Sequence, residues 1–161
     1  MTNNGRLKKY RHAPPHLFEA GAIYMITARI YRGLPIMKNA ARKEDWISAF
    51  LTAADIYRWR TIAWVVLDNH YHGLLQAPED GAESLPAFVA SFHKFNARRW
   101  NVEDNTPGRR VWCNYWDTCI WSPRGFYIRL NYIFNNPVKH GLAQTAEEYR
   151  FSSFNWAGEN S

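Results

Sequence analysis

The sequence has few of the features that would indicate a secreted, disulfide-rich or membrane protein. Only two of its 161 residues are cysteines, Cys113 and Cys119, and their C-x5-C spacing matches no zinc or redox motif. We expect two free thiols in a reducing compartment. No apolar run approaches the roughly 20 residues that a membrane-spanning helix needs, and the basic N-terminal stretch lacks the apolar region of a signal peptide. These absences predict a cytoplasmic protein that does not enter a membrane.

Internal repeats and low-complexity segments are also absent, so nothing in the sequence divides it into several similar units. Hydrophobic residues make up 47% of the chain and aromatic residues 16%, which is enough apolar surface for a packed interior. A chain of 161 residues suits a single core. We therefore predict a basic N-terminal arm over residues 1–20, one domain over residues 21–145 and a C-terminal tail over residues 146–161.

Acidic residues are outnumbered, with 14 Asp and Glu against 20 Lys and Arg, and the net charge is +6. Clustered cations attract phosphates and release counterions, so nucleic acid is a natural ligand for such a chain. A basic surface that only keeps the protein in solution, with local ion pairs, is the alternative. The candidate DNA contacts are Lys8, Lys9 and Arg11, then Arg98, Arg99, Arg109 and Arg110, then Arg129, Lys139 and His140.

Hydrophobic periodicity predicts four strands and three helices. The predicted strands are 22–30, 61–67, 70–77 and a short one within 111–120. The predicted helices are 39–59, 84–99 and 122–136. Asp68-Asn69 separates the second and third strands, and both residue types tolerate the positive φ angles of a tight turn. Pro137 disfavours the helical conformation in the residue before it, so we expect the last helix to end near Asn136.

The predicted helices begin at residues that commonly cap N-termini: Asn39, Ser84 and Ser122. The second helix should bury a face made of Leu85, Phe88, Phe92 and Phe95. The order β-α-β-β-α-β, followed by an extra helix, suits the α+β class. It predicts a ferredoxin-like split βαβ sandwich, with an antiparallel sheet, two helices on one face and an additional C-terminal helix on the other.

The stretch LDNHYHGLL, residues 67–75, places two histidines in an otherwise apolar strand. Side chains alternate along a strand, so His70 and His72 share one face, while Tyr71 points to the face that the first two helices cover. The Cα atoms of the two histidines are about 7 Å apart, close enough for both imidazoles to bind one metal ion. A structural role is the alternative, because His-x-His pairs are common by chance.

The last helix carries two different stripes. The stripe that faces the core consists of Phe126, Leu130, Ile133 and Phe134. Ile128, Tyr132 and Asn136, at intervals of four residues, lie on the other. An amide oxygen facing the two histidines would give an incomplete N/O ligand set that suits Mg²⁺ or Mn²⁺, and the phenol would be a covalent nucleophile beside a metal-bound phosphate. A core tyrosine and an ordinary helix end are the alternatives.

These segments carry a resemblance to a known family. DNHYHGLL resembles the His-hydrophobe-His element of the HUH single-strand DNA endonucleases. YWDTCI and SPRGFYIRLNYIFNNPVKHGL resemble the tyrosine helix and following segment of single-tyrosine HUH transposases, in particular the REP-associated tyrosine transposases. The likeness covers roughly residues 20–145. Two positions depart from the pattern: Tyr71 replaces a commoner small aliphatic residue, and Thr118 stands where the family often has another His.

The resemblance implies a ferredoxin-like fold and a divalent metal, Mg²⁺ or Mn²⁺, held by His70, His72 and Asn136. It implies that Tyr132 attacks a phosphate of single-stranded DNA, leaving a 5′-phosphotyrosine link and a free 3′-OH, after which the strand can be rejoined. Members of this branch recognise short palindromic hairpins with a flanking guide tetranucleotide, so single-stranded or hairpin DNA is the expected partner. We expect a monomer, with a helix-swapped dimer as the alternative.

Position along the chain separates the tyrosines. Tyr71 points to the wrong face of its strand, Tyr115 precedes the helix, and Tyr127 lies near the core stripe, so Tyr132 is the predicted nucleophile. Arg129, one turn before it, could steady a phosphate. A solvated helix arginine is the alternative for that residue.

Two other functions compete with this interpretation. A non-catalytic hairpin DNA or RNA binding protein on the same scaffold would bind through stacking and basic residues, but it has no need for His70, His72, Tyr132 and Asn136 together. A small metal-dependent hydrolase acting on another substrate is disfavoured by the positive charge and by the absence of a carboxylate near the histidines to act as general base.

Overall fold

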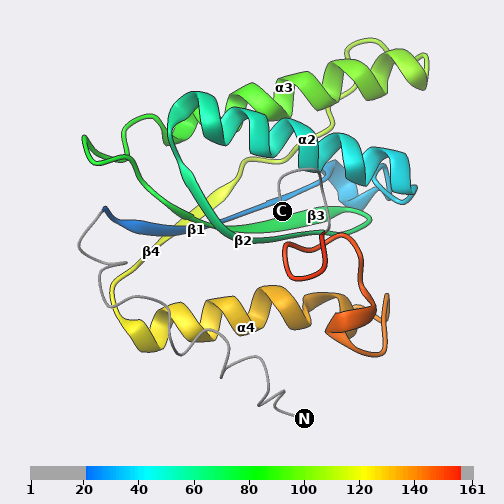
Figure 1. Ribbon diagram of the computed structural model, residues 1–161. Helices are drawn as coiled ribbons and strands as arrows, with labels where there is room; N and C mark the ends of the chain where they lie inside the picture. The colour runs from blue at the N-terminus through cyan, green and yellow to red at the C-terminus, as the bar shows by residue number, and fades with distance from the viewer. Residues whose placement is uncertain (1–20, 157–161) are drawn as a thin grey trace.

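Figure 1 shows the computed structural model, which describes residues 21–156. Four strands form one antiparallel sheet in the order β2-β3-β1-β4. The strands are β1 (Ile23–Arg29), β2 (Arg60–Val66), β3 (His70–Gln76) and β4 (Trp116–Ile120). Helices α2 (Ala40–Tyr57) and α3 (Leu85–Glu103) cover one face, and α4 (Pro123–Lys139) lies on the other (Figure 1). This arrangement confirms the predicted ferredoxin-like α+β sandwich with an additional C-terminal helix.

Some of the predictions fall on residues that the structure does not describe. The basic arm over residues 1–20, with Lys8, Lys9 and Arg11, lies outside the described residues, as do residues 157–161 of the predicted tail. Within residues 21–156, no helix is long and apolar enough to cross a membrane. Cys113 and Cys119 are free thiols, as predicted.

The sheet separates two hydrophobic cores. The larger core lies between the sheet and helices α2 and α3, and its centre is a group of aromatic side chains in mutual contact: Trp46, Phe50, Tyr71, Phe88 and Phe92. The smaller core lies between the sheet and α4 and contains the predicted stripe of Phe126, Leu130, Ile133 and Phe134. Each of these large side chains contributes about 1.5–3 kcal/mol by leaving water. Their burial holds α4 against the face that carries the two histidines.

The turn between β2 and β3 is tight, as predicted, but its backbone differs from the expectation. The Leu67 N–H donates to the His70 carbonyl at 2.8 Å, which closes a turn around Asp68 and Asn69. Neither Asp68 nor Asn69 adopts a positive φ. The conformational tolerance of these two residue types is therefore not what forms this turn.

Two of the three predicted helix caps are confirmed. The side chains of Asn39 and Ser122 accept hydrogen bonds from backbone N–H groups at the starts of α2 and α4. Ser84 occupies the corresponding position before α3, but its side chain makes no capping bond. Ser84 has a helical backbone rather than the extended one of a capping residue, and its hydroxyl accepts from Trp59 Nε1 at 2.8 Å.

The predicted buried face of α3 is wrong at one position. Leu85, Phe88 and Phe92 are buried, whereas Phe95 is 55% exposed. The buried side of the helix continues at intervals of four residues through Asn96 and Trp100, so Phe95 is rotated away from it by about 100°. The way α3 packs on the sheet, rather than the hydrophobicity of the Phe95 side chain, decides that Phe95 is exposed.

The predicted end of α4 is also wrong. The helix runs to Lys139 with Pro137 inside its last turn. Proline removes one N–H, but the following turn is still bonded: the His140 N–H donates to the Asn136 carbonyl at 3.1 Å and the Leu142 N–H to the Pro137 carbonyl at 2.9 Å. The extra turn carries Lys139 toward the histidines.

The segment after α4 folds back onto the sheet. After a short 3-10 turn η3 (Ala146–Glu148), the Tyr149 hydroxyl donates to the Val66 carbonyl at 2.6 Å, and Ser152 forms a bridge with Val65. Residues 149–153 therefore lie along β2, which would otherwise be an uncovered edge strand. This part of the predicted tail is packed against the domain.

A partly buried histidine at the edge of the larger core predicts that the fold is sensitive to acid. His93 on α3 stacks on Trp112 with 4.3 Å between ring centres, and its Nε2 lies 2.8 Å from the Tyr71 hydroxyl. Burial among these rings lowers the pKa of His93 from 6.5 to about 3. Between these two values the unfolded chain binds a proton that the folded protein does not, so the stability contribution is complete above pH 6.5 and is lost as the pH falls toward 3.

We expect the free energy of unfolding to decrease by roughly 1 kcal/mol per pH unit on account of His93 as the pH falls from about 6 to 4. His93→Gln keeps an acceptor for the Tyr71 hydroxyl but cannot take up a proton. Its stability in urea should therefore depend less on pH than that of the wild type. The same pH dependence in both proteins would contradict the assignment.

Candidate active site

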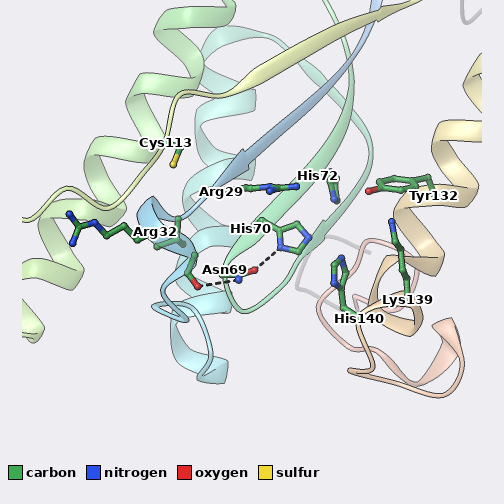
Figure 2. A pocket seen from close by; sticks show the side chains of 11 residues that line it. Arg29, Arg32, Asn69, His70, His72, Cys113, Tyr132, Lys139 and His140 are labelled. Carbon is green, nitrogen blue, oxygen red and sulfur yellow. Dashed lines mark hydrogen bonds between the residues drawn. The ribbon is translucent and has the colours of Figure 1, made fainter.

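A hollow of about 390 Å³ lies at the end of the sheet where β1 and β3 approach the C-terminal end of α4 (Figure 2). Its lining side chains include Arg29, Arg32, Asn69, His70, His72, Cys113, Tyr132, Lys139 and His140. None of the residues that line it, within the described part of the chain, is acidic. A pocket with several cations and no carboxylate suits an anionic group.

Of the four residues predicted to form the metal and tyrosine site, His70, His72 and Tyr132 line this hollow, and Asn136 is buried beside His70. The Tyr132 and His72 rings are 5.1 Å apart between centres, and Asn136 Oδ1 lies 3.3 Å from His70 Nε2. The phenol oxygen of Tyr132 points toward His72 in Figure 2. Tyr132 and Asn136 are one turn apart along α4, which is close to the distance between His70 and His72 along β3. Tyr132 can therefore meet His72 while Asn136 meets His70.

Hydrogen bonds on the outer side of each imidazole determine which nitrogen faces the hollow. Asn69 Nδ2 donates to the Gly33 carbonyl, so its Oδ1, 2.8 Å from His70 Nδ1, accepts the proton of that nitrogen. Thr27 Oγ1 lies 2.7 Å from His72 Nδ1. A proton on His70 Nδ1 leaves a lone pair on its Nε2, and His72 Nε2 carries the same lone pair in the tautomer in which Thr27 Oγ1 accepts from Nδ1. Such outer hydrogen bonds orient metal-binding histidines.

Both histidines are held in the neutral form. Burial, reinforced by the neighbouring His140, lowers the pKa of His70 to about 4. Burial, reinforced by His70, lowers the pKa of His72 to about 3. A neutral imidazole is the form that binds a metal, so both side chains are available at physiological pH without first losing a proton.

The donor atoms around the histidines fit a cation. His70 Nε2 and Asn136 Oδ1 face each other although each presents a lone pair, an arrangement that is favourable only with a cation between them or after the amide rotates to present Nδ2. Asn136 is 1% exposed, and neither its Nδ2 nor His72 Nε2 has a hydrogen-bond partner among the described residues. Two imidazole nitrogens and one amide oxygen leave open positions for water or a phosphate oxygen.

Basic side chains surround the proposed ligands His70, His72 and Asn136. Lys139 Nζ lies 5.3 Å from the centre of the Tyr132 ring, and the His140 ring is 4.9 Å from that of His70. Lys139 and His140, both predicted DNA contacts, therefore line the hollow. Arg29 on β1 and Arg32 in the short helix η2 (Tyr31–Gly33) line it as well, and sequence reasoning missed both.

A signal for Arg29 was present in the sequence. Thr27 and Arg29 alternate with apolar residues at the end of the first strand, on the face that also carries Ile23 and Met25. What the alternation could not show is the register, which pairs Arg29 with His70 and Thr27 with His72.

The remaining basic residues lie elsewhere. Arg98 and Arg99 are on α3, on the opposite face of the sheet from α4. Arg99 Nε lies 3.3 Å from Glu103 and 3.5 Å from Asp45. Arg99 therefore has surface ion-pair partners, which was the alternative to a DNA contact, and it does not line the hollow.

Three further basic residues have partners of their own. Arg109 forms an ion pair with Asp104 at 2.9 Å. The Arg110 guanidinium covers the Tyr31 ring at 4.5 Å. The Arg129 guanidinium lies 3.9 Å from Met25 Sδ, on the sheet face that α4 covers but outside the lining of the hollow.

The other candidate tyrosines do not reach the hollow. Tyr71 is fully buried in the larger core. Tyr127 packs against Phe126 and the smaller core. Tyr115 precedes β4 and does not line the hollow.

The known proteins that resemble this chain in sequence are named as REP-associated tyrosine transposases. No protein-family model matches the chain. It is 28% identical over 121 residues to a Haemophilus influenzae protein named as a REP-associated tyrosine transposase, covering 68% of this chain and 67% of that protein. It is 26% identical over 109 residues to the REP-associated tyrosine transposase of Escherichia coli, covering 60% of this chain and 62% of that protein. The chain thus spans about two thirds or less of the length of these relatives.

Two solved structures share the fold. One is a REP-associated tyrosine transposase bound to a REP hairpin, with a TM-score of 0.69 and 20% identity over 84% of this chain and 78% of the other. The second is a Deinococcus radiodurans protein described as a transposase, with a TM-score of 0.50 and 17% identity over 70% of this chain and 88% of the other. The chain is thus similar in sequence to REP-associated tyrosine transposases and shares its fold with one of them.

Proposed function

We propose that the chain is a metal-dependent single-strand DNA endonuclease and transposase, which binds DNA hairpins and cleaves and rejoins one strand through a 5′-phosphotyrosine intermediate. The observation that carries this proposal is the convergence of the Tyr132 phenol on two neutral histidines in a cationic hollow, with Asn136 buried beside His70. The names of the two relatives, and the REP hairpin bound by the similarly folded protein, support the same substrate class.

Tyr132 is the proposed nucleophile. Its oxygen forms a bond to the phosphorus of a backbone phosphate, and the bond from that phosphorus to the 3′ oxygen breaks. The phenol loses its proton to solvent and the leaving 3′ oxygen gains one, while the reverse attack by a 3′-OH rejoins the strand. Lys139, whose ammonium lies over the phenol ring, would stabilise the ionised tyrosine. Because α4 docks on its own sheet, we propose that a monomer suffices.

His70, His72 and Asn136 are the proposed ligands of Mg²⁺ or Mn²⁺. When bound, the ion would neutralise charge on the phosphate under attack. Arg29 beside His70 would bind a second oxygen or the next phosphate along the strand, since guanidinium groups match phosphate geometry. Among the described residues that line the hollow, none is acidic and able to activate water as a general base, which favours a tyrosine nucleophile over direct hydrolysis.

A covalent-adduct assay tests the proposal. Labelled hairpin DNA with single-stranded flanks is incubated with the protein and Mg²⁺, and the products are separated on a denaturing gel. We expect a labelled species that survives detergent and disappears on protease treatment. Hairpin binding without any such species would support the second candidate, a non-catalytic hairpin DNA or RNA binding protein on the same scaffold.

DNA binding should weaken steeply with salt. If the basic residues contact roughly six phosphates, log K should fall with log salt at a slope of about −4 to −5. Arg29→Gln should lower the affinity and make the slope less negative by about 0.7–0.9, because one phosphate contact is lost.

Arg98→Gln is the matched control, since this arginine lies on the opposite face of the sheet. Fluorescence anisotropy of labelled hairpin DNA at several salt concentrations measures both slopes. Equal effects of the two substitutions would show that the α3 side also contacts DNA. A plain duplex that binds better than the hairpin would contradict recognition of unpaired strands.

A further inference from the structure

Within residues 21–156, helix α4 covers only part of the sheet face that carries the histidines. Helix α4 makes its sheet contacts mainly with β2 and β3, whereas β4 is the strand at the other edge. The register pairs Trp116 on β4 with Thr27, and Thr27 in turn with His72. These three side chains therefore form one row across the same face, and Trp116, at its open end, is 76% exposed.

The surroundings of Trp116 are polar and cationic. Thr118, two residues further along β4 on the same face, is exposed. The Arg129 guanidinium lies against Met25, whose strand partner is Thr118. Met25 and Thr118 form the next row on the same face, two residues along from the row of Thr27 and Trp116. Asp117 belongs to the opposite face, because its partner is Ile26, a member of the larger core.

This combination favours nucleic acid over protein as the occupant. A single exposed aromatic residue is common on protein surfaces, so it is the position of Trp116 in one row with Thr27 and His72 that makes it a candidate site. The centre of a protein interface would be apolar, whereas the face around Trp116 also carries the exposed Thr118 and, against Met25, the Arg129 guanidinium. An exposed aromatic ring and a guanidinium on the same sheet face match an unpaired base and a neighbouring phosphate.

We propose that Trp116 is a stacking platform for an unpaired base of the DNA strand next to the phosphate at Tyr132, with Arg129 binding the phosphate of that base. The inference rests on the proposed function and adds a site to it. Neighbouring strands are about 4.8 Å apart, so Trp116, two strands from His72, lies about 10 Å across the sheet from it. That separation suits a nucleotide close to the scissile phosphate. Stacking needs only the flat face of a base, so this site holds the strand without selecting its sequence.

The test measures binding of a labelled, unstructured DNA oligonucleotide, with no cleavage involved. Trp116→Ala should weaken binding about tenfold, and Trp116→Phe should stay within about threefold of the wild type, because a smaller ring still stacks. Trp121→Ala is the matched control: Trp121 is 85% exposed but follows the far end of β4, away from the hollow, and its loss should leave affinity unchanged. All three variants should keep the melting temperature of the wild type, because these side chains are exposed.

A second substrate separates the platform from the hairpin. A hairpin without single-stranded flanks should bind the wild type and Trp116→Ala equally well. Equal oligonucleotide affinity of Trp116→Ala and wild type, an equal loss in Trp121→Ala, or a wild type that does not bind the oligonucleotide would each overturn the proposal. So would a wild-type dimer that Trp116→Ala dissociates, since the ring would then cover a second copy.

The two proposals fail differently. A protein that never forms the covalent adduct but loses oligonucleotide affinity in Trp116→Ala refutes the cleavage function and keeps the platform. A protein that forms the adduct but whose Trp116→Ala variant binds the oligonucleotide normally refutes only the platform.

Discussion

Tyr132→Phe should abolish the covalent protein–DNA adduct while leaving hairpin affinity nearly unchanged. The substitution removes only the phenol oxygen and keeps the ring that contacts His72 and Lys139. Tyr132 is 38% exposed, so the fold loses little packing in any case. Without the oxygen the proposed chemistry has no nucleophile, and we expect the rate of adduct formation to fall by about 10³-fold or more.

Tyr127→Phe is the control on the same helix. Its ring packs against Phe126 on the core side, so losing that hydroxyl should leave both cleavage and binding intact. Mass spectrometry of the adduct after trypsin and nuclease digestion identifies the modified residue. An adduct on a residue other than Tyr132, or an undiminished adduct in Tyr132→Phe, would refute the assignment.

Removing divalent metal should also stop adduct formation. EDTA should reduce the wild-type reaction to background, and Mg²⁺ or Mn²⁺ should restore it. His70→Ala should have the same effect as EDTA in the presence of metal. His70 is only half-buried, so its truncation costs the fold little, whereas His72 is 5% exposed and bonded to Thr27. For that reason His72→Gln, which keeps volume and polarity, is preferred to the alanine variant at that position.

Asn136 provides a measurement that does not depend on activity. Asn136→Asp places a carboxylate in a site that is 1% exposed, which destabilises the metal-free protein because a buried charge lacks a partner. Added Mn²⁺ should raise the melting temperature of Asn136→Asp more than that of the wild type, and should leave Asn136→Leu unchanged. The metal site would be ruled out if adduct formation persists in EDTA and Mn²⁺ does not change the melting temperature of the wild type, Asn136→Asp or Asn136→Leu.

The sequence by itself determined the order of the elements and the faces of the key residues. Alternation along a strand put His70 and His72 on one side and Tyr71 on the other, and helical spacing separated Tyr132 and Asn136 from the apolar stripe of the last helix. These features follow from backbone geometry within a single element, so they hold whatever the element packs against.

Tertiary structure alone decided how the elements meet. The pairing of Arg29 with His70 and of Trp116 with Thr27 depends on strand register, which joins segments far apart in the chain. The exposure of Phe95 depends on how α3 crosses the sheet. Pro137 lies inside α4, where the last turn is held by bonds beyond the proline, although local preference predicts an earlier end. At Pro137 the packing of α4 outweighs a local preference of about 3 kcal/mol. Strand register and helix orientation are set by contacts between distant segments, and no single segment of the sequence contains that information.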